Sequence, residues 1–403
     1  MDQIATAGNK GERVRSDCFV SLQLKQSGGI TIQLKSKVES NFGSQIRGQA
    51  LKVLESLEVS HASVELIDAG ALPFVIAARL EAAVRQLKST NQRHVPPMIP
   101  QNLDKTSRDR FRFSRLYLPG NTPSMMLNAG LHYPDGIILD LEDSVAPGKK
   151  AEARLLVRNA LCQVDFYGAE RMVRINQLPA GLDDLDDIIP RHVHLVLIPK
   201  CETGSQVKQV EERITSILDI HQMKREVFLM PIIESALGVE NAFHMATSSD
   251  LVVAMAIGLE DYTADLGVKR TIGGDESLYA RTRLVNACKA AGIQPIDSVF
   301  SDVADMEGLK KNVERSRSLG FEGMGCIHPR QVQVIHEGFC PNEAEVRRAE
   351  TIIAAFEDAE ARGLGVIALG TKMIDLPVVK RAQQTMELAL RFGLRKQTGL
   401  KQS

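Results

Sequence analysis

Tryptophan is absent from this chain, and aromatic residues make up only 4% of it. Proteins that bind single-stranded nucleic acid use aromatic rings as stacking platforms, so this composition argues against that function class. A surplus of charge of one sign is also missing, because 49 basic residues face 50 acidic ones and the net charge is −1. A general polyanion binder needs a basic surface. The charge balance therefore argues against a general polyanion binder and is compatible with a local anion site.

Long apolar runs and clustered cysteines are lacking as well. No apolar stretch reaches the roughly 20 residues that span a bilayer, and residues 1–15 mix charges without the apolar segment of a secretory signal. The six cysteines are scattered, and no two have metal-ligand spacing. This usage is typical of buried thiols in a reducing compartment. We expect a soluble, cytoplasmic protein with no membrane or nucleic-acid partner.

A polar, proline-rich segment, residues 89–109, separates two units and is predicted to be a linker in which little packs. Residues 1–88 are predicted to form a small ββαβα sandwich domain. Its expected elements are strands near 19–24 and 30–34, a helix that begins at the capping box Ser36–Glu39, a strand near 64–66 and a helix over 73–87.

Residues 110–360 alternate short apolar runs with amphipathic stretches about eight times, which indicates an α/β protein with a (β/α)₈ TIM barrel. A doubly wound open sheet is the alternative, but no glycine-rich dinucleotide turn follows any strand. Residues 361–403 are predicted to form a C-terminal lid and helix. The expected strands are 115–118, 136–139, 172–175, 194–198, 227–233, 251–257, 293–296 and 323–327.

Polar side chains follow most of these strands, at the end where TIM barrels carry their active sites. They are Asp140, Glu142, Asp143, Arg174, Asn176, Lys200, Glu234, Glu260, Asp261, Asp297 and His328. A single carboxylate after a strand is often only a helix cap, and Asp143, Glu260 and Asp265 fit caps or solvated charges. Caps do not explain Arg174 or Lys200, since a buried cation needs an anion. The set predicts a site for an anionic substrate and a hard cation.

Several segments resemble the citrate lyase β-subunit and CoA-ester lyase family, within the HpcH/HpaI aldolase superfamily. They are Ser114–Gly120, Ile137–Pro147, Val173–Asn176, Ile198–Lys200, Ile232–Ala236, Gly258–Gly267, Cys326–Pro329 and Gly370–Pro377. The resemblance implies a homotrimer of barrels that needs Mg²⁺, with Glu234 and Asp261 as protein ligands of the metal. Asp140 would hold metal-bound water, and Arg174 would stabilise the acyl-thioester carbonyl as it becomes an enolate.

The same resemblance places Arg115 beside the bound acid, and we group Lys200 and His328 with the substrate-binding residues. It also implies that Asp375, on the C-terminal lid, reaches a neighbouring subunit's site as an acid or base. By itself, Asp375 ahead of Pro377 reads as a helix N-cap. His328 before Pro329 also fits a structural turn. In the stretch Gly320–Met324, where the family commonly carries Lys, this chain has Met324.

Residues 17–88 resemble the acyl carrier (γ) subunit of citrate lyase, through Val38–Arg47 and Asp68–Ala83. That carrier bears a phosphoribosyl-dephospho-CoA arm on a serine in a Ser-x-Asp setting. Alignment on Asp17 puts Arg15 at the serine position and Ser16 beside it. Either Ser16 carries the arm or the domain has lost it, and we favour the loss.

The leading hypothesis is a lyase that cleaves citryl-ACP or citryl-CoA into oxaloacetate and an acetyl thioester. The alternative is a citramalyl-CoA or malyl-CoA lyase that releases pyruvate or glyoxylate. The cofactors implied are Mg²⁺ and a CoA thioester or carrier arm, and the citrate lyase α-subunit is an implied partner. A non-catalytic assembly subunit would have lost Glu234 or Asp261, and both are present. A class II pyruvate aldolase is disfavoured by the carrier-like domain.

Overall fold

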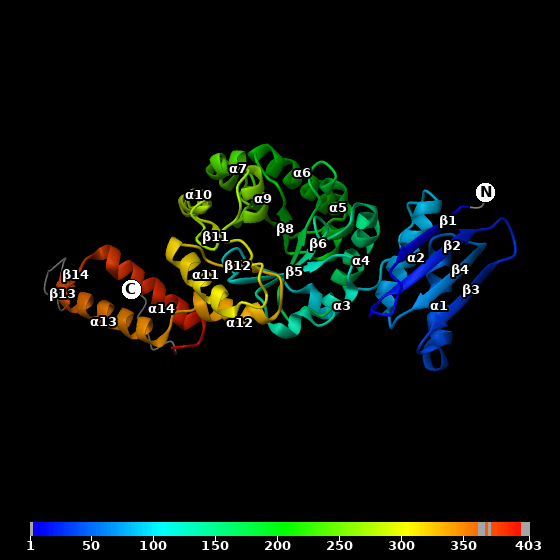
Figure 1. Cartoon of the computed structure of the whole chain (residues 1–403), viewed down its shortest axis with the longest axis horizontal. Coiled ribbons are helices and arrows are strands. Elements are labelled where there is room, and N and C mark those ends of the chain that lie inside the picture. Colours follow the sequence, from blue (N-terminus) through cyan, green and yellow to red (C-terminus); the bar gives the residue numbers. More distant parts are fainter. Residues whose placement is uncertain (1–2, 362–366, 370–371, 396–403) are drawn as a thin grey trace.

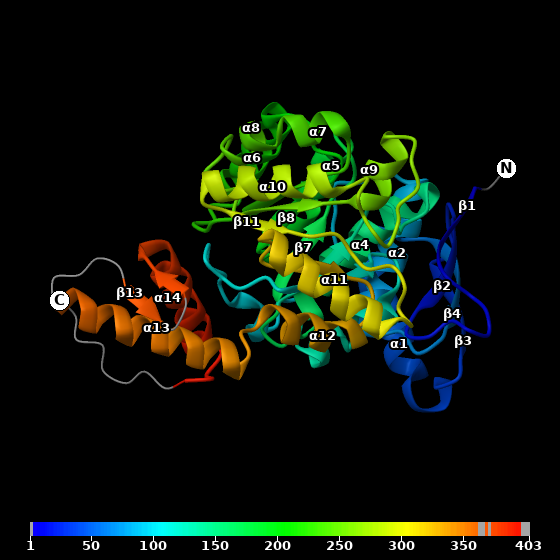
Figure 2. The ribbon, with the colours of Figure 1, turned by 60° about the vertical axis from the view of Figure 1, so that its left-hand side comes forward.

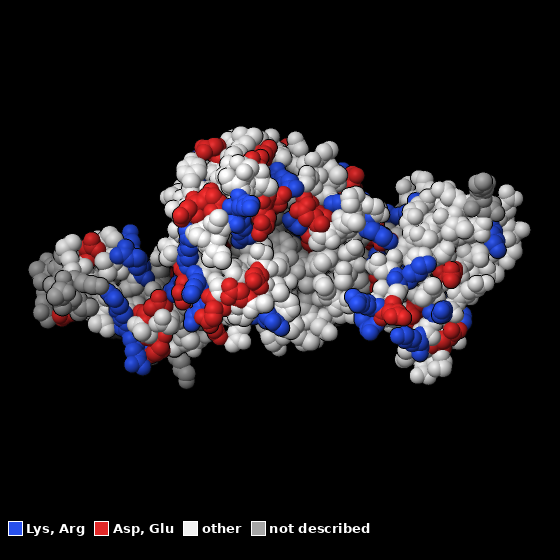
Figure 3. Space-filling view, in the orientation of Figure 1, with Lys and Arg blue, Asp and Glu red and all other residues white. Residues whose placement is uncertain are grey.

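The computed structural model describes residues 3–361, 367–369 and 372–395. Three parts follow one another along the molecule in Figure 1: a small α/β domain at one end, a barrel in the middle, and a helical hairpin at the other end. Lys and Arg alternate with Asp and Glu over the face in Figure 3, without a large area of one sign. Within the described residues, no helix is both long and apolar enough to cross a membrane.

The front domain has four strands rather than the three that the sequence predicted. Its sheet has the order β1-β2-β4-β3. β1 was missed because its buried residues, Ala5 and Ala7, are small and give little strand signal. The elements are β1 (Ile4–Gly8), β2 (Cys18–Leu24), β3 (Ile30–Ser36), α1 (Glu39–Ser56), β4 (Ala62–Asp68) and α2 (Pro73–Leu87).

The predicted capping box at the start of α1 is wrong. Val38 is the N-cap residue of α1, and no side chain caps the helix. The Ser36 hydroxyl instead donates to Asp68 at 2.6 Å, a carboxylate at the end of β4. Ser36 is the last residue of β3, which pairs with β4 in parallel register. Because Ser36 lies opposite Asp68 in this register, its hydroxyl bonds Asp68 and does not cap the helix.

Eight parallel strands form the central sheet, and each lies where the sequence placed it. Their order is β11-β10-β9-β8-β7-β6-β5-β12, and a parallel bridge between Asp297 and Met324 joins its two ends. The sheet therefore curls into a nearly closed barrel, and the open-sheet alternative is wrong. The strands are β5 (Ser114–Pro119), β6 (Gly136–Asp140), β7 (Glu170–Arg174), β8 (Leu195–Ile198), β9 (Phe228–Ile233), β10 (Ala254–Ile257), β11 (Gln294–Ile296) and β12 (Met324–Cys326).

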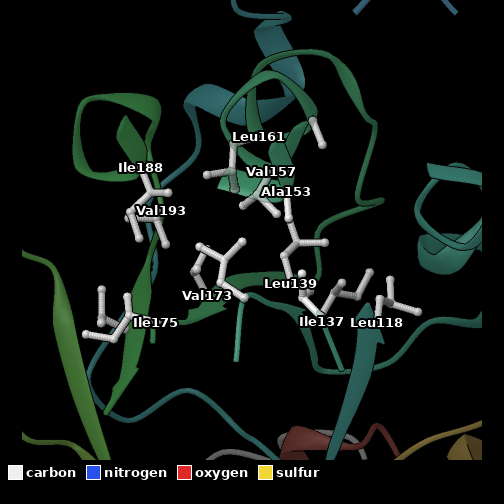
Figure 4. Close-up of a cluster of buried hydrophobic side chains, with 14 of the residues drawn as sticks. Leu118, Ile137, Leu139, Ala153, Val157, Leu161, Val173, Ile175, Ile188 and Val193 are labelled. Carbon is white, nitrogen blue, oxygen red and sulfur yellow. The ribbon is translucent and has the colours of Figure 1, made fainter. Parts of the chain in front are cut away.

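Helices cover the outside of the barrel (Figures 1 and 2). In α4, Ala153, Val157 and Leu161 recur every four residues on one face and pack over strand residues such as Leu139 and Val173 (Figure 4). Burial of each large aliphatic side chain contributes about 1.5–3 kcal/mol. These helices are α3 (Pro123–Met126), α4 (Lys150–Gln163), α5 (Gly181–Ile188), α6 (Gly204–Ile220), α7 (Ala236–Glu240), α8 (Ala242–Ala246), α9 (Leu259–Asp265), α10 (Leu278–Ala291), α11 (Met306–Leu319) and α12 (Arg330–Phe339).

The segment predicted to be a linker with little packing lies against the barrel. It contains the 3₁₀ helix η1 (Pro100–Leu103), and Asn102 within it is only 1% exposed. The Asn102 amide donates to the carbonyls of Leu161 and Val164, at 2.9 and 2.8 Å. The expectation that little in this segment packs is therefore wrong, because the buried Asn102 amide and further hydrogen bonds, such as Ile99 amide to Cys162 carbonyl, attach the segment to the barrel.

The described C-terminal part is a hairpin of α13 (Glu343–Ala361) and α14 (Leu376–Arg391). The two helices share a small core that includes Ile352, Phe356, Val379 and Ala382. Between them, β13 (Ile367–Leu369) pairs antiparallel with β14 (Lys372–Ile374). The hairpin extends from the barrel on the side away from the front domain (Figure 1). Part of the predicted lid, including Gly370 and Thr371 of its motif, lies outside the described residues.

Candidate active site

A cavity of about 390 Å³ lies at the carboxyl ends of the barrel strands. We call it the site cavity. Its charged lining residues come from six of the eight barrel strands and the loops that follow them, which is why residues far apart in the sequence meet there. They are Arg115 of β5, Asp140 and Asp143 at and after β6, Arg174 of β7, Glu234 after β9, Glu260 and Asp261 after β10, and Asp297 after β11.

Arg174 is the best-held side chain of the site cavity. Its Nε and Nη2 each donate to one oxygen of Asp140, both at 2.7 Å, and its Nη1 lies 2.9 Å from Glu142. Burial disfavours the charge on Asp140, but the bonds from Arg174 outweigh it and hold the pKa of Asp140 below its usual value. These bonds hold the guanidinium in one orientation. Its central carbon, Cζ, lies 5.5 Å from the centroid of the Tyr117 ring.

Arg115 is a buried cation without an acidic partner. It is 1% exposed, its Nη1 contacts the sulfur of Met230 at 2.8 Å, and its Nε has no hydrogen-bond partner. No carboxylate in the described part of the chain forms an ion pair with it. Burial lowers the pKa of Arg115 to about 10. A guanidinium that lines a cavity in this state is suited to an anionic group of the substrate.

Glu234 and Asp261 are the two predicted metal ligands, and both line the site cavity. Glu234 is 6% exposed. Burial, together with the negative charges of Asp261 and Glu142, raises the pKa of Glu234 to about 7. Gly258 makes room for this side chain, since a Cβ there would lie 2.5 Å from Glu234 Oε1. A bound cation would lower the pKa of such a buried acid and so favour its ionised form.

The residues of this cavity fit Mg²⁺ better than zinc. Within the described residues, no group of three or more His, Cys, Asp or Glu side chains is arranged to hold a metal ion. A structural zinc ion needs four such ligands. Mg²⁺ commonly takes one or two carboxylates and completes its shell with water and substrate oxygens. Glu234 and Asp261 offer that pair, beside a cation, Arg115, that a substrate anion would satisfy.

Lys200 and His328, the other two predicted substrate-binding residues, do not line the site cavity itself. The Lys200 amide donates to Glu234 at 2.8 Å, and its ammonium lies 3.3 Å from Asp261. Its backbone adopts a left-handed φ of 46°, which is strained for a residue other than glycine. His328 lines a second cavity of about 490 Å³, which we call the side cavity, and its Nδ1 accepts from the Arg330 amide at 3.2 Å. The His328 side chain thus also stabilises the turn at the start of α12, as the sequence allowed.

Like Lys200, the predicted residues Asp375 and Ser16 line neither cavity in this chain. Asp375 is the N-cap of α14, and its carboxylate accepts from the Val378 amide at 3.3 Å. No described residue of the hairpin lines the site cavity. Ser16 precedes β2 with a φ of 55°, and its amide donates to the Ala69 carbonyl. The cap that local sequence favoured for Asp375 is present, and its role in catalysis stays a prediction.

Glu142 and Asp143 take part in the site, although the sequence assigned no role to Glu142 and only a cap or a solvated charge to Asp143. Glu142 accepts from Gln177 at 2.9 Å as well as pairing with Arg174. Asp143, which we read as a cap, lines the site cavity, and burial together with Glu142 raises its pKa to about 6. Their position directly after a strand was the available signal. The cap reading holds for Asp265, whose carboxylate accepts from the first amide of α7 at 2.8 Å.

Asp297 is already neutralised by a partner. It forms a buried ion pair with Arg281 of α10, and its amide donates to the Gly323 carbonyl at 2.8 Å where the barrel closes. Glu260 is exposed and pairs with Arg270 at 2.7 Å. These two carboxylates border the cavity, but arginines of the same chain, Arg281 and Arg270, already neutralise them.

Comparison with known proteins agrees with this arrangement. A family model described as HpcH/HpaI aldolase/citrate lyase matches residues 114–329, and an acyl carrier model described as malonate decarboxylase delta subunit (MdcD) matches residues 5–87. The chain is 38% identical over 284 residues to citrate lyase subunit beta of Leuconostoc mesenteroides, which covers 70% of this chain and 94% of that protein.

Two further similarities widen the comparison. The chain is 31% identical over 323 residues to the mitochondrial citramalyl-CoA lyase of Homo sapiens, covering 76% of this chain and 94% of that protein. Among solved structures, protein CitE of Mycobacterium tuberculosis in complex with magnesium, acetoacetate and coenzyme A is similar with a TM-score of 0.59 and 27% identity. That similarity covers 70% of this chain and 99% of the other.

Proposed function

This chain belongs to the HpcH/HpaI aldolase/citrate lyase family, and on that basis we propose that it is a Mg²⁺-dependent lyase that cleaves a citryl thioester into oxaloacetate and an acetyl thioester. The observation that carries the proposal is the site cavity, where Glu234 and Asp261, two carboxylates of the kind that binds Mg²⁺, share one space with two guanidinium groups. The relatives named citrate lyase subunit beta support the substrate.

The chemistry divides between the ion and the side chains. Bound Mg²⁺, held by Glu234 and Asp261, would lower the pKa of the substrate hydroxyl. Arg115 holds the carboxylate of the acid part, since it has no partner of its own. A base, either a site carboxylate or water, takes the hydroxyl proton, and that oxygen becomes the carbonyl of oxaloacetate as the carbon–carbon bond breaks. The electron pair passes to the acyl thioester as an enolate, and Arg174 faces this negative charge in an orientation fixed by Asp140.

The enolate carbon takes a proton to give the acetyl thioester. Asp375 is our proposed donor, and it requires a second copy of the chain because it caps α14 outside the cavity of its own chain. Met373 and Leu376 beside it are 66% and 58% exposed, which suits contact with another subunit. We therefore propose a homotrimer, and light scattering coupled to size-exclusion chromatography tests it, since a monomer that retains activity contradicts this role of Asp375.

The remaining assignments follow from the carrier-like domain and the thiols. We propose domain limits of 1–88, 110–360 and 361–403, a citrate lyase α-subunit as partner, and a cytoplasmic location. Five of the six cysteines are buried, and all are free thiols, which fits a reducing compartment. Lys200, which contacts Glu234 and Asp261, and His328, which lines the side cavity, are proposed to bind the substrate. An arm on Ser16 is tested by the intact mass of the natively expressed chain.

The test of the proposed function is a product assay on the full chain after removal of metal with EDTA. We expect Mg²⁺ to restore cleavage of citryl-CoA, with oxaloacetate detected through malate dehydrogenase and NADH. Glu234→Gln should abolish this activity, whereas Glu260→Gln, a change of the same size on an exposed side chain, should retain it. Activity that survives in Glu234→Gln would contradict the metal assignment.

A citramalyl-CoA lyase is the second candidate, because relatives with that name are 31–32% identical to the chain. Citramalyl-CoA and malyl-CoA are assayed in parallel, with pyruvate detected through lactate dehydrogenase and glyoxylate by its phenylhydrazone. The thioester with the highest kcat/KM identifies the substrate. A much higher value for citramalyl-CoA would replace the citryl assignment while leaving the reaction type unchanged.

A further inference from the structure

We propose that the front domain is a permanent part of the active site and that its loop of residues 9–16, here called the rim loop, binds the phosphate groups of a CoA-type thioester without a covalent bond. The proposal rests on the proposed function, because it takes such a thioester as the substrate. It differs from the role of an acyl carrier, which presents its thioester on a covalent arm and moves between partners.

Helix α2 shows that the front domain does not detach. Every residue from Phe74 to Val84 is buried. One side of α2 covers β1 and β2, and another side packs against α4 of the barrel. A helix that is buried all round belongs to the interior of one structure. A mobile carrier would leave the outer side of this helix in water, so the apolar burial favours permanent docking.

Buried charges connect the same two helices. Arg158 of α4 donates from Nη1 and Nη2 to the carboxylate of Glu81 of α2, at 2.9 and 2.7 Å, and both side chains are 0% exposed. The neighbouring Asn159 amide donates to the Phe74 carbonyl at 3.0 Å. A buried charge is tolerated when its partner is in place, and here each charge has a close partner in the other domain besides one in its own, Arg85 for Glu81 and Asp187 for Arg158.

The first end of the rim loop is attached to the barrel near the start of α4. The Gly8 amide donates to Glu152 at 2.9 Å, and the Gly8 carbonyl accepts from Lys149 at 3.2 Å. Lys149 and Glu152 belong to the segment that follows β6, the strand that ends at Asp140. The carboxyl ends of parallel barrel strands share one face. This end of the loop therefore lies on the face that carries the site cavity.

The second end is attached to the loop after β5. Asp17 accepts two bonds from Arg79, at 3.0 and 2.9 Å, and Arg79 Nη2 also donates to the Asn121 carbonyl at 3.0 Å. Gly120, next to Asn121, donates to the carbonyl of Asp140 at 2.7 Å. A continuous series of contacts thus connects the rim loop to the residue that orients Arg174.

The rim loop offers cations at this place. Lys10, Arg13 and Arg15 are exposed, and Glu12 is the single acid among them. Arginine forks match phosphate oxygens in geometry and charge. Ser16 has a left-handed φ of 55°, and its amide donates to the Ala69 carbonyl, so the front domain holds this end of the loop in place with no arm attached.

The side cavity runs from the site cavity to the loop after β5, the loop that Arg79 connects to Asp17 at the end of the rim loop. It is bordered by Pro119, Ser124 and Met125, on either side of Asn121. It shares Tyr117, Asp140, Ser144 and Ile327 with the site cavity. An uncharged, narrow pantetheine chain fits such a mostly apolar passage, with the phosphates outside at the rim loop and the thioester inside at Arg174. The barrel position Met324 is fully buried at the start of β12, so it takes no part in phosphate binding.

The test compares two double variants of the full chain that remove the same charge. Arg13→Gln/Arg15→Gln alters the rim loop, and Lys35→Gln/Lys37→Gln alters exposed residues on and after β3, the edge strand farthest from β1. We measure the Kd of free CoA by calorimetry, and KM and kcat for citryl-CoA and for citryl-N-acetylcysteamine, a thioester without phosphate. Intact mass is recorded for each protein.

We expect the rim-loop variant to raise the Kd of CoA and the KM of citryl-CoA about tenfold with kcat unchanged. KM for citryl-N-acetylcysteamine should not change, and the control variant should match wild type for both thioesters. An unchanged Kd in the rim-loop variant would overturn the proposal, and so would an added mass on Ser16. Failure of wild type to cleave either thioester would refute the proposed function instead, while the CoA affinities would still decide the role of the rim loop.

Discussion

Replacing Glu234 by Gln is expected to stabilise the metal-free protein at pH 8 and to remove its response to Mg²⁺. Glu234 is 6% exposed, and burial with nearby negative charge raises its pKa from 4.5 to about 7. The folded protein therefore binds a proton more tightly than the unfolded chain between these values. At pH 8 the side chain is ionised in both states, and its charge is less favourable in the folded one.

The size of the effect follows from the two pKa values. Their difference is about 2.5 units, and each unit corresponds to about 1.36 kcal/mol, so the ionised Glu234 lowers the free energy of unfolding by about 3 kcal/mol above pH 7. Gln cannot ionise, so Glu234→Gln recovers most of this amount at pH 8. The gain shrinks as the pH falls from 7 towards 4.5, where wild-type Glu234 is itself protonated.

The assay is thermal unfolding in EDTA at pH 8 and pH 5.5, repeated at pH 8 with Mg²⁺. We expect Glu234→Gln to melt about 5 °C or more above wild type at pH 8, with a smaller difference at pH 5.5. Mg²⁺ should raise the melting temperature of wild type, by RT ln(1 + [Mg²⁺]/Kd) in free energy, and leave the variant unchanged. The control, Glu260→Gln, removes a carboxylate that is 59% exposed and should behave as wild type. A metal-free Glu234→Gln protein that melts lower than wild type at pH 8 would refute this reasoning.

Four further predictions rest on single side chains. Arg174→Lys keeps the charge but loses the two-bond contact with Asp140, so kcat should fall about 100-fold or more with little change in KM; a loss under tenfold contradicts the role. Arg115→Met should raise the KM of the thioester at least about tenfold without lowering the melting temperature, because the buried cation has no acidic partner; a strongly destabilised variant would show that the cation is paired. Lys200→Met should tighten Mn²⁺ binding, measured by electron paramagnetic resonance, because the ammonium 3.3 Å from Asp261 no longer competes; weaker binding counts against this. Burial and the charge of Arg171 lower the pKa of His194 from 6.5 to about 4, so the free energy of unfolding should fall by about 3 kcal/mol as the pH drops from 6.5 to 4. In urea unfolding, His194→Gln should lose less of this free energy over the same pH range. A pH profile identical to that of wild type would be inconsistent with a buried neutral His194.

Local patterns were sufficient for the barrel strands. Parallel strands that are buried on both faces read as short continuous apolar runs, and β6 and β9 have only buried residues. The same patterns failed for β1, whose inward residues are alanines. They also failed for residues 89–109, because polar composition does not reveal that one amide, Asn102, will be buried against α4.

The sequence predicted which carboxylates lie at the carboxyl ends of the barrel strands, but not which cation each of them pairs with. Asp297 and Asp140 both follow apolar strands, yet Arg281 neutralises the first and Asp140 orients a guanidinium of the site. Asp143 and Asp265 both read as caps, and only Asp265 caps a helix. Which acid pairs with which cation depends on the three-dimensional neighbours, and these come from other strands.

The sequence by itself determined the α/β class, the eight barrel strands and the family-like motifs, because apolar periodicity and residue order are local properties. The tertiary structure decided that Arg115 has no acidic partner, that Glu234 is crowded by other acids, and that the front domain is joined to the barrel through Arg158 and Glu81. Charge energies depend on burial and on distances between residues far apart in the chain, and only the folded arrangement sets both.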